Sequence, residues 1–378
     1  MTWPSVKLKD CCICIADGDH QPPPKANAGV PFVTISNIDA FNTLDFENAM
    51  HVPREYYDGL DPKRRATTGD VLYSVVGSFG IPVLIKDETP FVFQRHIAIL
   101  RPNKAMLDSR FLYYAMRGKE FYDRADAAAI GAAQRTISLS ALKNLEIPLP
   151  PIPVQQGIAD ILSAYDDLIE NNRKQIKLRE EAAQRLYKEW FIDLRFPGYK
   201  HTPIINGIPE GWKKILLSNL IEIKYGKDHK GIADGNIPVY GSGGLMRKCC
   251  KALFVGEAVL IPRKGSLNNI MYVNEAFWTV DTMFYAIPKR AGLGFCVYFF
   301  LRTLDMYSLD IGSAVPSMTT NILNSLEMLL PTQNSLDKFQ QTVYVYFQQI
   351  SLLRNQKDKL AEARDRLLNK LLGGKLAT

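Results

Sequence analysis

Residues 154–194 read VQQGIADILSAYDDLIENNRKQIKLREEAAQRLYKEWFIDL, and this stretch predicts one long amphipathic helix. Its apolar residues recur alternately four and three positions apart, which is the heptad spacing of a helix that packs against another helix. After Gly157 no glycine or proline interrupts the stretch, and Pro153 and Pro197 lie at its two ends. Roughly 38 helical residues at about 1.5 Å each span about 57 Å. A helix of that length needs a partner helix to bury its apolar side.

The predicted partner lies in the same chain, 181 residues further along, where the same spacing recurs up to the helix-stopping pair Gly373-Gly374. We call the two sets of regularly spaced apolar residues the helix seams. They comprise Ile158, Leu162, Tyr165, Ile169, Ile176 and Leu186 in the first helix, and Phe339, Val343, Tyr346, Ile350, Leu353, Leu360 and Leu367 in the second. The seams also hold the polar residues Asn172, Arg179, Lys357 and Arg364, which at such positions usually set register and pairing.

The same shift relates the sequence before each helix, so the chain is predicted to be a tandem duplication of a globular region followed by a long helix. Ile130-Gly131 matches Ile311-Gly312, and Leu149-Pro150 matches Leu330-Pro331. We expect globular regions at residues 1–151 and 197–331, followed by helices at residues 152–196 and 332–378.

Each globular region contains short runs of Val, Ile, Phe and Tyr that are separated by Gly, Pro, Asp and Asn, which is typical of short strands joined by turns. Strands and helices do not alternate along either region, so the sequence does not indicate a parallel sheet. The predicted fold class is therefore α+β, with two mixed regions of short strands and two long helices. Within the first region, Ser140 is the predicted N-cap of a short helix that starts at Ala141.

Composition describes an ordinary globular protein with a mild basic excess. The chain has 378 residues, of which 47% are hydrophobic and 22% are charged, and its formal net charge is +7. This charge is compatible with a polyanionic partner without requiring one. The N-terminus lacks an apolar signal region and no apolar run reaches membrane-spanning length, so we expect a cytoplasmic protein.

The motifs of common enzyme classes are absent from the sequence. It has no phosphate-binding loop, dinucleotide fingerprint, nucleophile elbow or zinc-protease motif, and no methyltransferase tetrapeptide. The six cysteines include the adjacent pairs Cys11-Cys12 and Cys249-Cys250 and form no Cys-x-x-Cys. Buried, reduced thiols are expected, and neither a metal site nor a catalytic site is predicted.

The turns between the predicted strands carry chemistry suited to nucleic acid. The second region offers the basic turn Arg263–Ser266 and the glycine-rich turn Tyr240–Gly244, and the first offers Gln94–His96 and Gln134-Arg135. Lys and Arg neutralise phosphates, Arg and Gln read base edges, and glycine turns let backbone N–H groups approach phosphates. A turn Arg or Lys taken alone is more typical of a solvated surface, and a glycine-rich turn is more typical of a flexible loop, so the prediction rests on equivalent turns in both regions.

The complete chain resembles the specificity subunit of type I restriction-modification systems, on an ordered set of segments. These are ISLSALKNLEIPLPPIPVQQGIADILSAYDDLIENNRKQI, REEAAQRLYKEWF, IPVYGSGGL, VLIPRKGS and FWTVDTMFYAI. The resemblance implies that the globular regions are target recognition domains, each binding one half of a bipartite double-stranded DNA site. It implies that the two helices pack antiparallel as a coiled-coil spacer, dock the modification subunits and bring the chain ends close together.

The resemblance also implies a non-catalytic subunit. Adenine N6 methylation with S-adenosylmethionine, and cleavage with ATP and Mg²⁺, then belong to the methyltransferase and restriction-translocase subunits. The first region has no basic counterpart of Arg263 and Lys264. Their role in DNA contact is therefore expected to fall to Arg64, Arg65 or Arg95. The candidate DNA contacts are Arg64, Arg65, Ser78, Gln94, Arg95, Gln134, Arg135, Lys227, Tyr240, Ser242, Arg263 and Lys264.

Three other interpretations of the sequence stay open. The chain would look the same as the recognition subunit of a type II-like complex that cuts without translocating. A coiled-coil interaction protein whose globular regions bind protein is a second alternative. An enzyme that acts alone is the third.

Overall fold

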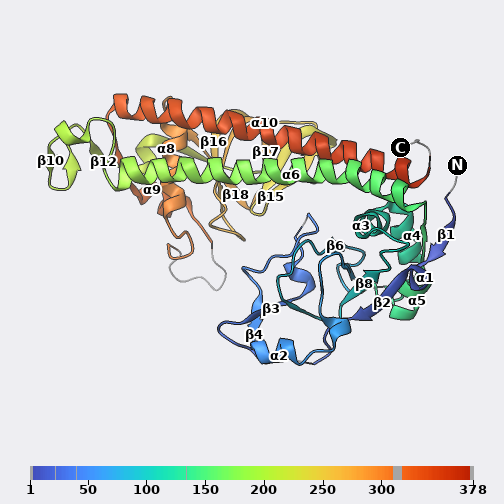
Figure 1. Ribbon diagram of the computed structural model, residues 1–378. Helices are drawn as coiled ribbons and strands as arrows, with labels where there is room; N and C mark the ends of the chain where they lie inside the picture. The colour runs from blue at the N-terminus through green and yellow to red at the C-terminus, as the bar shows by residue number, and fades with distance from the viewer. Residues whose placement is uncertain (1–2, 22, 40, 133, 310–316, 375–378) are drawn as a thin grey trace. The chain divides into compact units, whose positions relative to one another are not determined.

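The computed structural model describes residues 3–21, 23–39, 41–132, 134–309 and 317–374, and it divides into two compact units. Unit 1 consists of residues 1–172 and 355–378, and unit 2 consists of residues 173–354. Both boundaries fall inside long helices, α6 (Ile152–Tyr187) and α10 (Gln333–Leu372). Each unit therefore contains part of both helices, which are the green and red helices of Figure 1. The α+β class is confirmed.

Unit 1 contains two small sheets, which are joined by a buried cluster that includes Val33, Leu72 and Phe93. The larger is antiparallel with the order β2 (Cys12–Asp17), β8 (Ile97–Pro102), β5 (Val71–Ser74) and β6 (Pro82–Leu84). The smaller has the order β4 (Met50–Val52), β3 (Val30–Val33) and β7 (Val92–Phe93), in which β3 and β7 run parallel. A separate pair joins β1 (Ser5–Lys7) to β9 (Glu146–Pro148).

Helices cover the larger sheet of unit 1. They are α1 (Leu8–Cys11), α3 (Ser109–Arg117), α4 (Lys119–Ala128) and α5 (Leu139–Asn144), and α2 (Arg54–Asp58) lies in the long connection between β4 and β5. One core joins α3, the sheet and both long helices, because Phe111 and Tyr73 belong to the same buried cluster as Leu162 and Leu371.

Unit 2 has a single sheet of six strands. Its order is β13 (Ile221–Tyr225), β18 (Met283–Pro288), β16 (Phe254–Pro262), β17 (Met271–Thr279), β14 (Asp234–Gly241) and β15 (Gly244–Cys249). Its helices are α7 (Leu217–Leu220), α8 (Leu293–Thr303) and α9 (Thr320–Ser325). Two-stranded pairs join β12 (Lys213–Leu216) to β19 (Glu327–Leu330) and β10 (Ile204–Ile205) to β11 (Ile208–Pro209). After α6 the chain forms one π-helical turn, Lys188–Ile192.

The two units repeat the same backbone plan, as the duplicated sequence predicts. Leu8 N donates to Leu145 O over 2.9 Å in unit 1, and Leu217 N donates to Leu326 O over 2.8 Å in unit 2. The short helices α5 and α9 begin at equivalent caps, where Ser138 and Thr319 accept from backbone N–H groups three residues later. The predicted cap at Ser140 is wrong, because α5 starts at Leu139 and Ser140 lies inside it.

The segments of α6 and α10 pack antiparallel within each unit. In unit 1 the guanidinium of Arg364 pairs with Asp166, and in unit 2 Arg354 Nη2 donates to Glu180 Oε1 over 2.8 Å. Every apolar seam residue predicted from the sequence is buried or half-buried. The polar seam residues Asn172 and Arg364 are buried too. The seams therefore serve the packing of each unit.

Candidate nucleic-acid interface

In unit 1 four loops converge at the end of the larger sheet where β2 and β5 finish and β8 begins. Gly18 N donates to Ile97 O over 3.0 Å, and Val75 N donates to His96 O over 2.9 Å. Gly77 N donates to Arg135 O over 3.2 Å. We call residues 17–19, 75–80, 94–96 and 134–136 the unit 1 turn cluster. It brings together the predicted contacts Ser78, Gln94, Arg95, Gln134 and Arg135.

The equivalent end of the unit 2 sheet carries a matching set of loops. Gly226 N donates to Met283 O over 3.0 Å, Arg263 N to Thr282 O over 2.8 Å and Val280 N to Tyr240 O over 3.1 Å. We call residues 225–227, 240–244, 263–266 and 279–282 the unit 2 turn cluster. It brings together the predicted contacts Lys227, Tyr240, Ser242, Arg263 and Lys264.

Two glycines that sequence reasoning missed make these convergences possible. A Cβ atom at Gly18 would lie 2.2 Å from Phe93 O, and one at Gly226 would lie 2.0 Å from Val280 O. Neither backbone oxygen has room to move away, so only glycine fits at the end of β2 and of β13. The available signal was a single glycine directly after a strand in both repeats.

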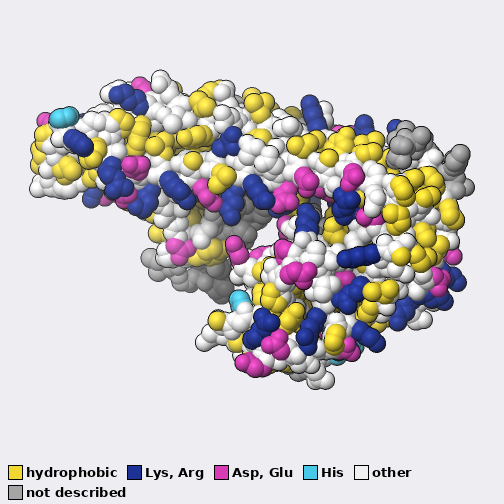
Figure 2. All heavy atoms as spheres, viewed as in Figure 1, with side chains coloured by type: hydrophobic (Ala, Val, Ile, Leu, Met, Phe, Trp, Pro, Cys, Tyr) yellow, Lys and Arg dark blue, Asp and Glu magenta, His cyan; other side chains and the backbone are white. Residues whose placement is uncertain are grey.

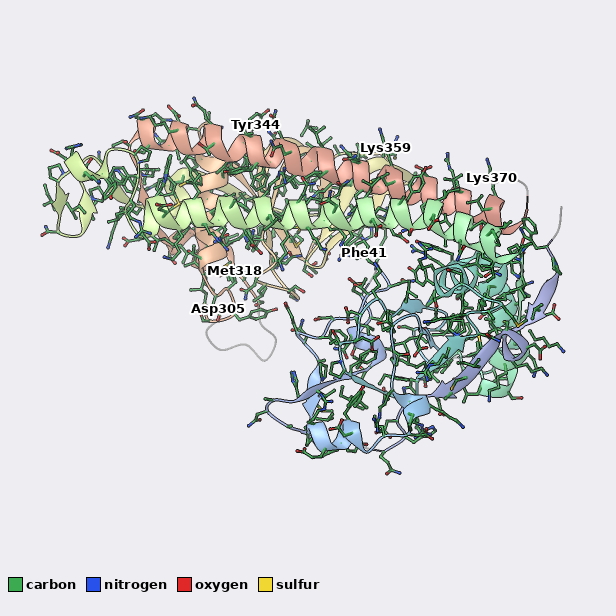
Figure 3. All side chains as sticks on the ribbon, in the orientation of Figure 1. Phe41, Asp305, Met318, Tyr344, Lys359 and Lys370 are labelled. Atoms are coloured by element: carbon green, nitrogen blue, oxygen red, sulfur yellow. The ribbon has the colours of Figure 1, made fainter. Side chains whose placement is uncertain are left out.

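The turn at Arg263 is held by contacts with neighbouring segments of unit 2. Met318 N donates to Arg263 O over 2.8 Å, and the side chain of Asn268 donates to Asp305 Oδ1 over 3.3 Å. Met318 and Asp305 are labelled in Figure 3, and both lie on the segments that flank this turn. Asn269 Nδ2 also donates to Ser242 O over 2.8 Å, which ties the basic turn to the glycine-rich turn.

Several predicted contacts are engaged by their own neighbours. Arg65 donates to Leu60 O and Asp58 O, and its guanidinium lies 5.5 Å from the centre of the Tyr57 ring. Arg135 pairs with Asp126, with Nε donating to Oδ1 over 2.8 Å. Because their donors are occupied, these two arginines hold loops in place.

Two predicted contacts in unit 2 also contact their own neighbours, although Arg263 Nε has no hydrogen-bond partner among the described residues. Arg263 lies 5.0 Å from the Tyr225 ring and 5.2 Å from the Phe284 ring, and its Nη1 donates to Asp281 O over 2.9 Å. The hydroxyl of Tyr240 donates to Glu275 Oε1 over 2.9 Å. Burial and the nearby Glu275 carboxylate both raise the pKa of Tyr240, so this phenol stays protonated.

The remaining candidates offer side chains to solvent. Arg64 is half-buried and lies 3.5 Å from the Asp17 carboxylate, and Gln94 is half-buried in the turn after β7. Ser242 is also half-buried. The exposed candidates are Ser78, Arg95, Gln134, Lys227 and Lys264. Burial, together with the neighbouring Arg95, lowers the pKa of His96, so this imidazole is neutral at physiological pH.

The charge distribution is mixed on the face seen in Figure 2. Figure 2 shows Lys and Arg side chains interspersed with Asp and Glu over the visible face. In the described part of the chain, no group of three or more His, Cys, Asp or Glu side chains is arranged to hold a metal ion. None of the helices described has the length and hydrophobicity that a membrane crossing requires.

The chain is similar to known proteins over nearly its whole length. A sequence model of the family described as Type I restriction modification DNA specificity domain matches residues 2–179 and 209–362. The type I restriction enzyme MjaIX specificity subunit of Methanocaldococcus jannaschii is 29% identical, over 71% of this chain and 69% of that protein. The putative MjaX specificity subunit of the same organism is 25% identical, over 99% of this chain and 93% of its own.

A solved structure shares the fold. The crystal structure of the type I restriction-modification S subunit from M. genitalium has a TM-score of 0.61 at 19% sequence identity, covering 98% of this chain and 96% of that one. The two segments that the family model matches correspond to the two repeats of the chain. The chain therefore belongs to the family of type I restriction-modification DNA specificity subunits.

Proposed function

We propose that the two turn clusters each bind one half of a bipartite, asymmetric site in double-stranded DNA. The observation that carries this proposal is that one backbone scaffold holds different side chains in its two copies. Matching backbone hydrogen bonds make Val75 of unit 1 equivalent to Arg263 of unit 2, and Val33 equivalent to Tyr240. Two copies of a reader with different side chains recognise different base sequences.

Within this proposal the exposed and the engaged candidates have different roles. Lys227 and Lys264 contact phosphates, whereas Ser78, Gln94, Arg95, Gln134 and Ser242 lie within reach of base edges or sugars. The engaged residues shape the loops that carry those contacts; they are Arg65, Arg135, Arg263 and Tyr240. Arg64, beside Asp17, contributes positive charge near the unit 1 turn cluster.

The specificity subunit is the non-catalytic member of type I systems, and S-adenosylmethionine and ATP belong to the modification and restriction subunits. We propose that this chain recruits two kinds of partner, methyltransferase subunits and an Mg²⁺-dependent restriction-translocase subunit, to DNA in the cytoplasm. The buried helix seams leave other apolar side chains exposed on α6 and α10 for docking. These are Ile161, Leu168, Leu178, Tyr344, Val345 and Leu352.

The long helices are proposed to set the distance between the half-sites, with target recognition domains at residues 1–151 and 197–331 and spacers at 152–196 and 332–378. Helices α6 and α10 contain 36 and 40 residues, which correspond to about 54 and 60 Å. That length suits half-sites roughly one and a half to two turns of DNA apart.

The test is a map of modified bases in DNA from cells that produce this chain with its modification subunit. One gapped, asymmetric motif with a methylated adenine in each half is expected. Insertion of one heptad after Gln175 and another after Gln356 should lengthen the gap and leave both halves unchanged. An unaltered gap would contradict the spacer role, and a heptad inserted after Gln175 alone controls for general disruption.

A further inference from the structure

The turn that follows β7 in unit 1 and the turn that follows β17 in unit 2 have the same backbone hydrogen bond. Ile97 N donates to Gln94 O over 2.9 Å, and Met283 N donates to Val280 O over 3.0 Å. The second residue of the turn is Arg95 in unit 1 and Asp281 in unit 2. Both side chains project from the turn into solvent and are exposed.

The surroundings of the two turns match as well. Gly18 and Gly226 donate to the last residue of their respective turns over 3.0 Å in each case. The third residues, His96 and Thr282, accept from Val75 and Arg263 over 2.9 and 2.8 Å. Arg95 and Asp281 therefore occupy one position of the repeated scaffold, and the charge at that position is opposite in the two units.

Both side chains are free of polar partners in the part of the chain that the structure describes. Among the described residues, no hydrogen bond or ion pair engages the guanidinium of Arg95 or the carboxylate of Asp281. This distinguishes Arg95 from Arg65 and Arg135, whose donors are occupied. Asp281 contributes only its backbone oxygen, which accepts from Arg263 Nη1.

An exposed carboxylate on a DNA-binding turn repels phosphates unless it faces a hydrogen-bond donor of a base. In the major groove the amino group of cytosine is the donor that Asp accepts from, whereas Arg donates to O6 and N7 of guanine. The cations Lys227, Lys264 and Arg263 in the same cluster offset the repulsion between Asp281 and the DNA backbone.

We infer that Asp281 is a specificity-determining residue that accepts from a cytosine amino group in the second half-site, at the scaffold position where Arg95 donates to a guanine in the first. The two readers thus share one geometry and invert the direction of hydrogen bonding. This inference rests on the proposed function, because it takes the turn clusters as the DNA-binding surfaces.

The experiment compares wild type, Asp281→Ala, Asp281→Asn and Arg95→Ala, each as the full chain assembled with its modification subunit. Binding to a pool of duplexes with randomised positions and mapping of modified bases give the recognised motif. Asp281→Ala should relax one cytosine of the second half-site only, with affinity for the original motif lower by about 10- to 100-fold. Arg95→Ala should relax one guanine of the first half-site only. Glu327→Ala, which removes an exposed carboxylate from β19, is the matched control and should leave the motif unchanged.

Melting temperature is measured for every variant, and Asp281→Asn, which keeps the side-chain size, covers the case in which Asp281→Ala folds poorly. An unchanged motif with both Asp281 variants, or relaxation at a base other than cytosine, would overturn the inference while leaving the proposed function standing. A wild-type complex that recognises no bipartite motif would instead overturn the proposed function and the inference with it.

Discussion

At the residue scale, Arg263 shows how one position of the repeat changes its role. Its place in unit 1 is taken by Val75, which is buried, and in unit 2 the guanidinium lies over two aromatic rings. Lys264, the next residue, is exposed. The basic turn therefore combines one structural cation with one cation that is available to a ligand.

Arg263→Ala should lower the stability of unit 2 by about 1–2 kcal/mol, because it removes two ring contacts and one hydrogen bond. Lys264→Ala should leave stability unchanged and weaken DNA binding. Denaturant unfolding of both variants, together with DNA titrations of the assembled complex, checks this pair. Wild-type stability of the Arg263→Ala variant would show that the ring contacts contribute nothing.

Glu257 makes the stability of unit 2 depend on pH. Burial raises the pKa of its carboxyl, and the hydrogen bond from the Tyr272 hydroxyl, 2.9 Å long, partly offsets that rise. An acid with a raised pKa binds more protons when folded, so its contribution to stability falls as pH rises from about 4.3, the unfolded value, through the folded value. Glu257→Gln should therefore melt higher than wild type at pH 8 and equally at pH 4. Glu210→Gln, at an exposed glutamate, is the control, and equal melting temperatures of wild type and Glu257→Gln at pH 8 would contradict the expectation.

The candidate site could be predicted from the sequence only as far as residue type and turn position. Ten of the twelve candidate residues lie in the two turn clusters, whereas Arg64 and Arg65 lie outside the unit 1 turn cluster. The sequence does not reveal which donors are already engaged, because the partners of Arg65 and Arg135 depend on how each loop folds back on itself. It also offered no reason to choose Asp281, since an acidic residue does not suggest DNA contact until its equivalence to Arg95 is known.

At the scale of elements, the two helices pack against their units through different chemistry. In unit 1, Asp166 of α6 pairs with the buried Arg364 of α10 and accepts from the Tyr114 hydroxyl over 2.7 Å. The 181-residue shift places Phe347 and Ala183 at the equivalent positions of unit 2. Phe299 of α8 is the counterpart of Tyr114, because the preceding tyrosines, Tyr298 and Tyr113, accept from Arg302 and Arg117 in the same way. One unit thus uses a buried ion pair where the other uses an aromatic cluster.

Asp166→Ala should destabilise unit 1 by about 1–3 kcal/mol, because it leaves the buried Arg364 with Asp365 as its remaining carboxylate partner and removes the acceptor of the Tyr114 hydroxyl. The triple change Tyr114→Phe, Asp166→Phe and Arg364→Ala installs the unit 2 residues and should recover most of that loss. Hydrogen exchange of unit 1 amides measures both effects. The control is Asp160→Ala, which breaks an exposed pair with Arg110 and should cost less than about 1 kcal/mol. A loss of similar size in both single variants would contradict the role given to the buried pair.

The elements themselves were largely predictable, because hydrophobic spacing is a local property of the sequence. The long helices and the repeat follow from it, and the family model matches both halves. The long connection between β3 and β5 in unit 1 was not predictable in detail. The equivalent part of unit 2 is the hairpin of β14 and β15, whose strands are joined by a short turn. In unit 1 the strand β3 pairs with β4 across a longer connection, and nothing in the sequence shows this pairing.

At the scale of the whole molecule, the phosphate contacts proposed for Lys227 and Lys264 predict a salt-dependent affinity for DNA. If Lys227 and Lys264 each neutralise one phosphate, replacing both by Ala should reduce the slope of log affinity against log salt by about 1.8. The recognised motif should not change. Titrations of the assembled complex at several salt concentrations measure the slope. A changed motif with an unchanged slope would mean that these lysines read bases instead.

The compact units did not follow from the sequence, which suggests globular regions with helices between them. The boundaries at Asn172 and Arg354 fall within the helices because each helix buries its two ends in different cores. Ile158 packs into the core of unit 1, whereas Ala183 packs into the core of unit 2. Which core receives a helical segment depends on the fold of the globular regions, and heptad spacing carries no information about it.

Unit 1 is formed by two segments that are far apart in the sequence, and this arrangement has a consequence for protein synthesis. Leu368 and Leu371 complete the core that also contains Ile158 and Leu162, and Trp3 Nε1 donates to Leu371 O over 3.5 Å. The ribosome makes the rest of this core before residues 173–354 and its closing segment after them, so unit 1 can close only once the whole of unit 2 has been made. A premature stop codon or frameshift between codons 355 and 368 would consequently damage the unit whose synthesis begins first and spare the one made after it.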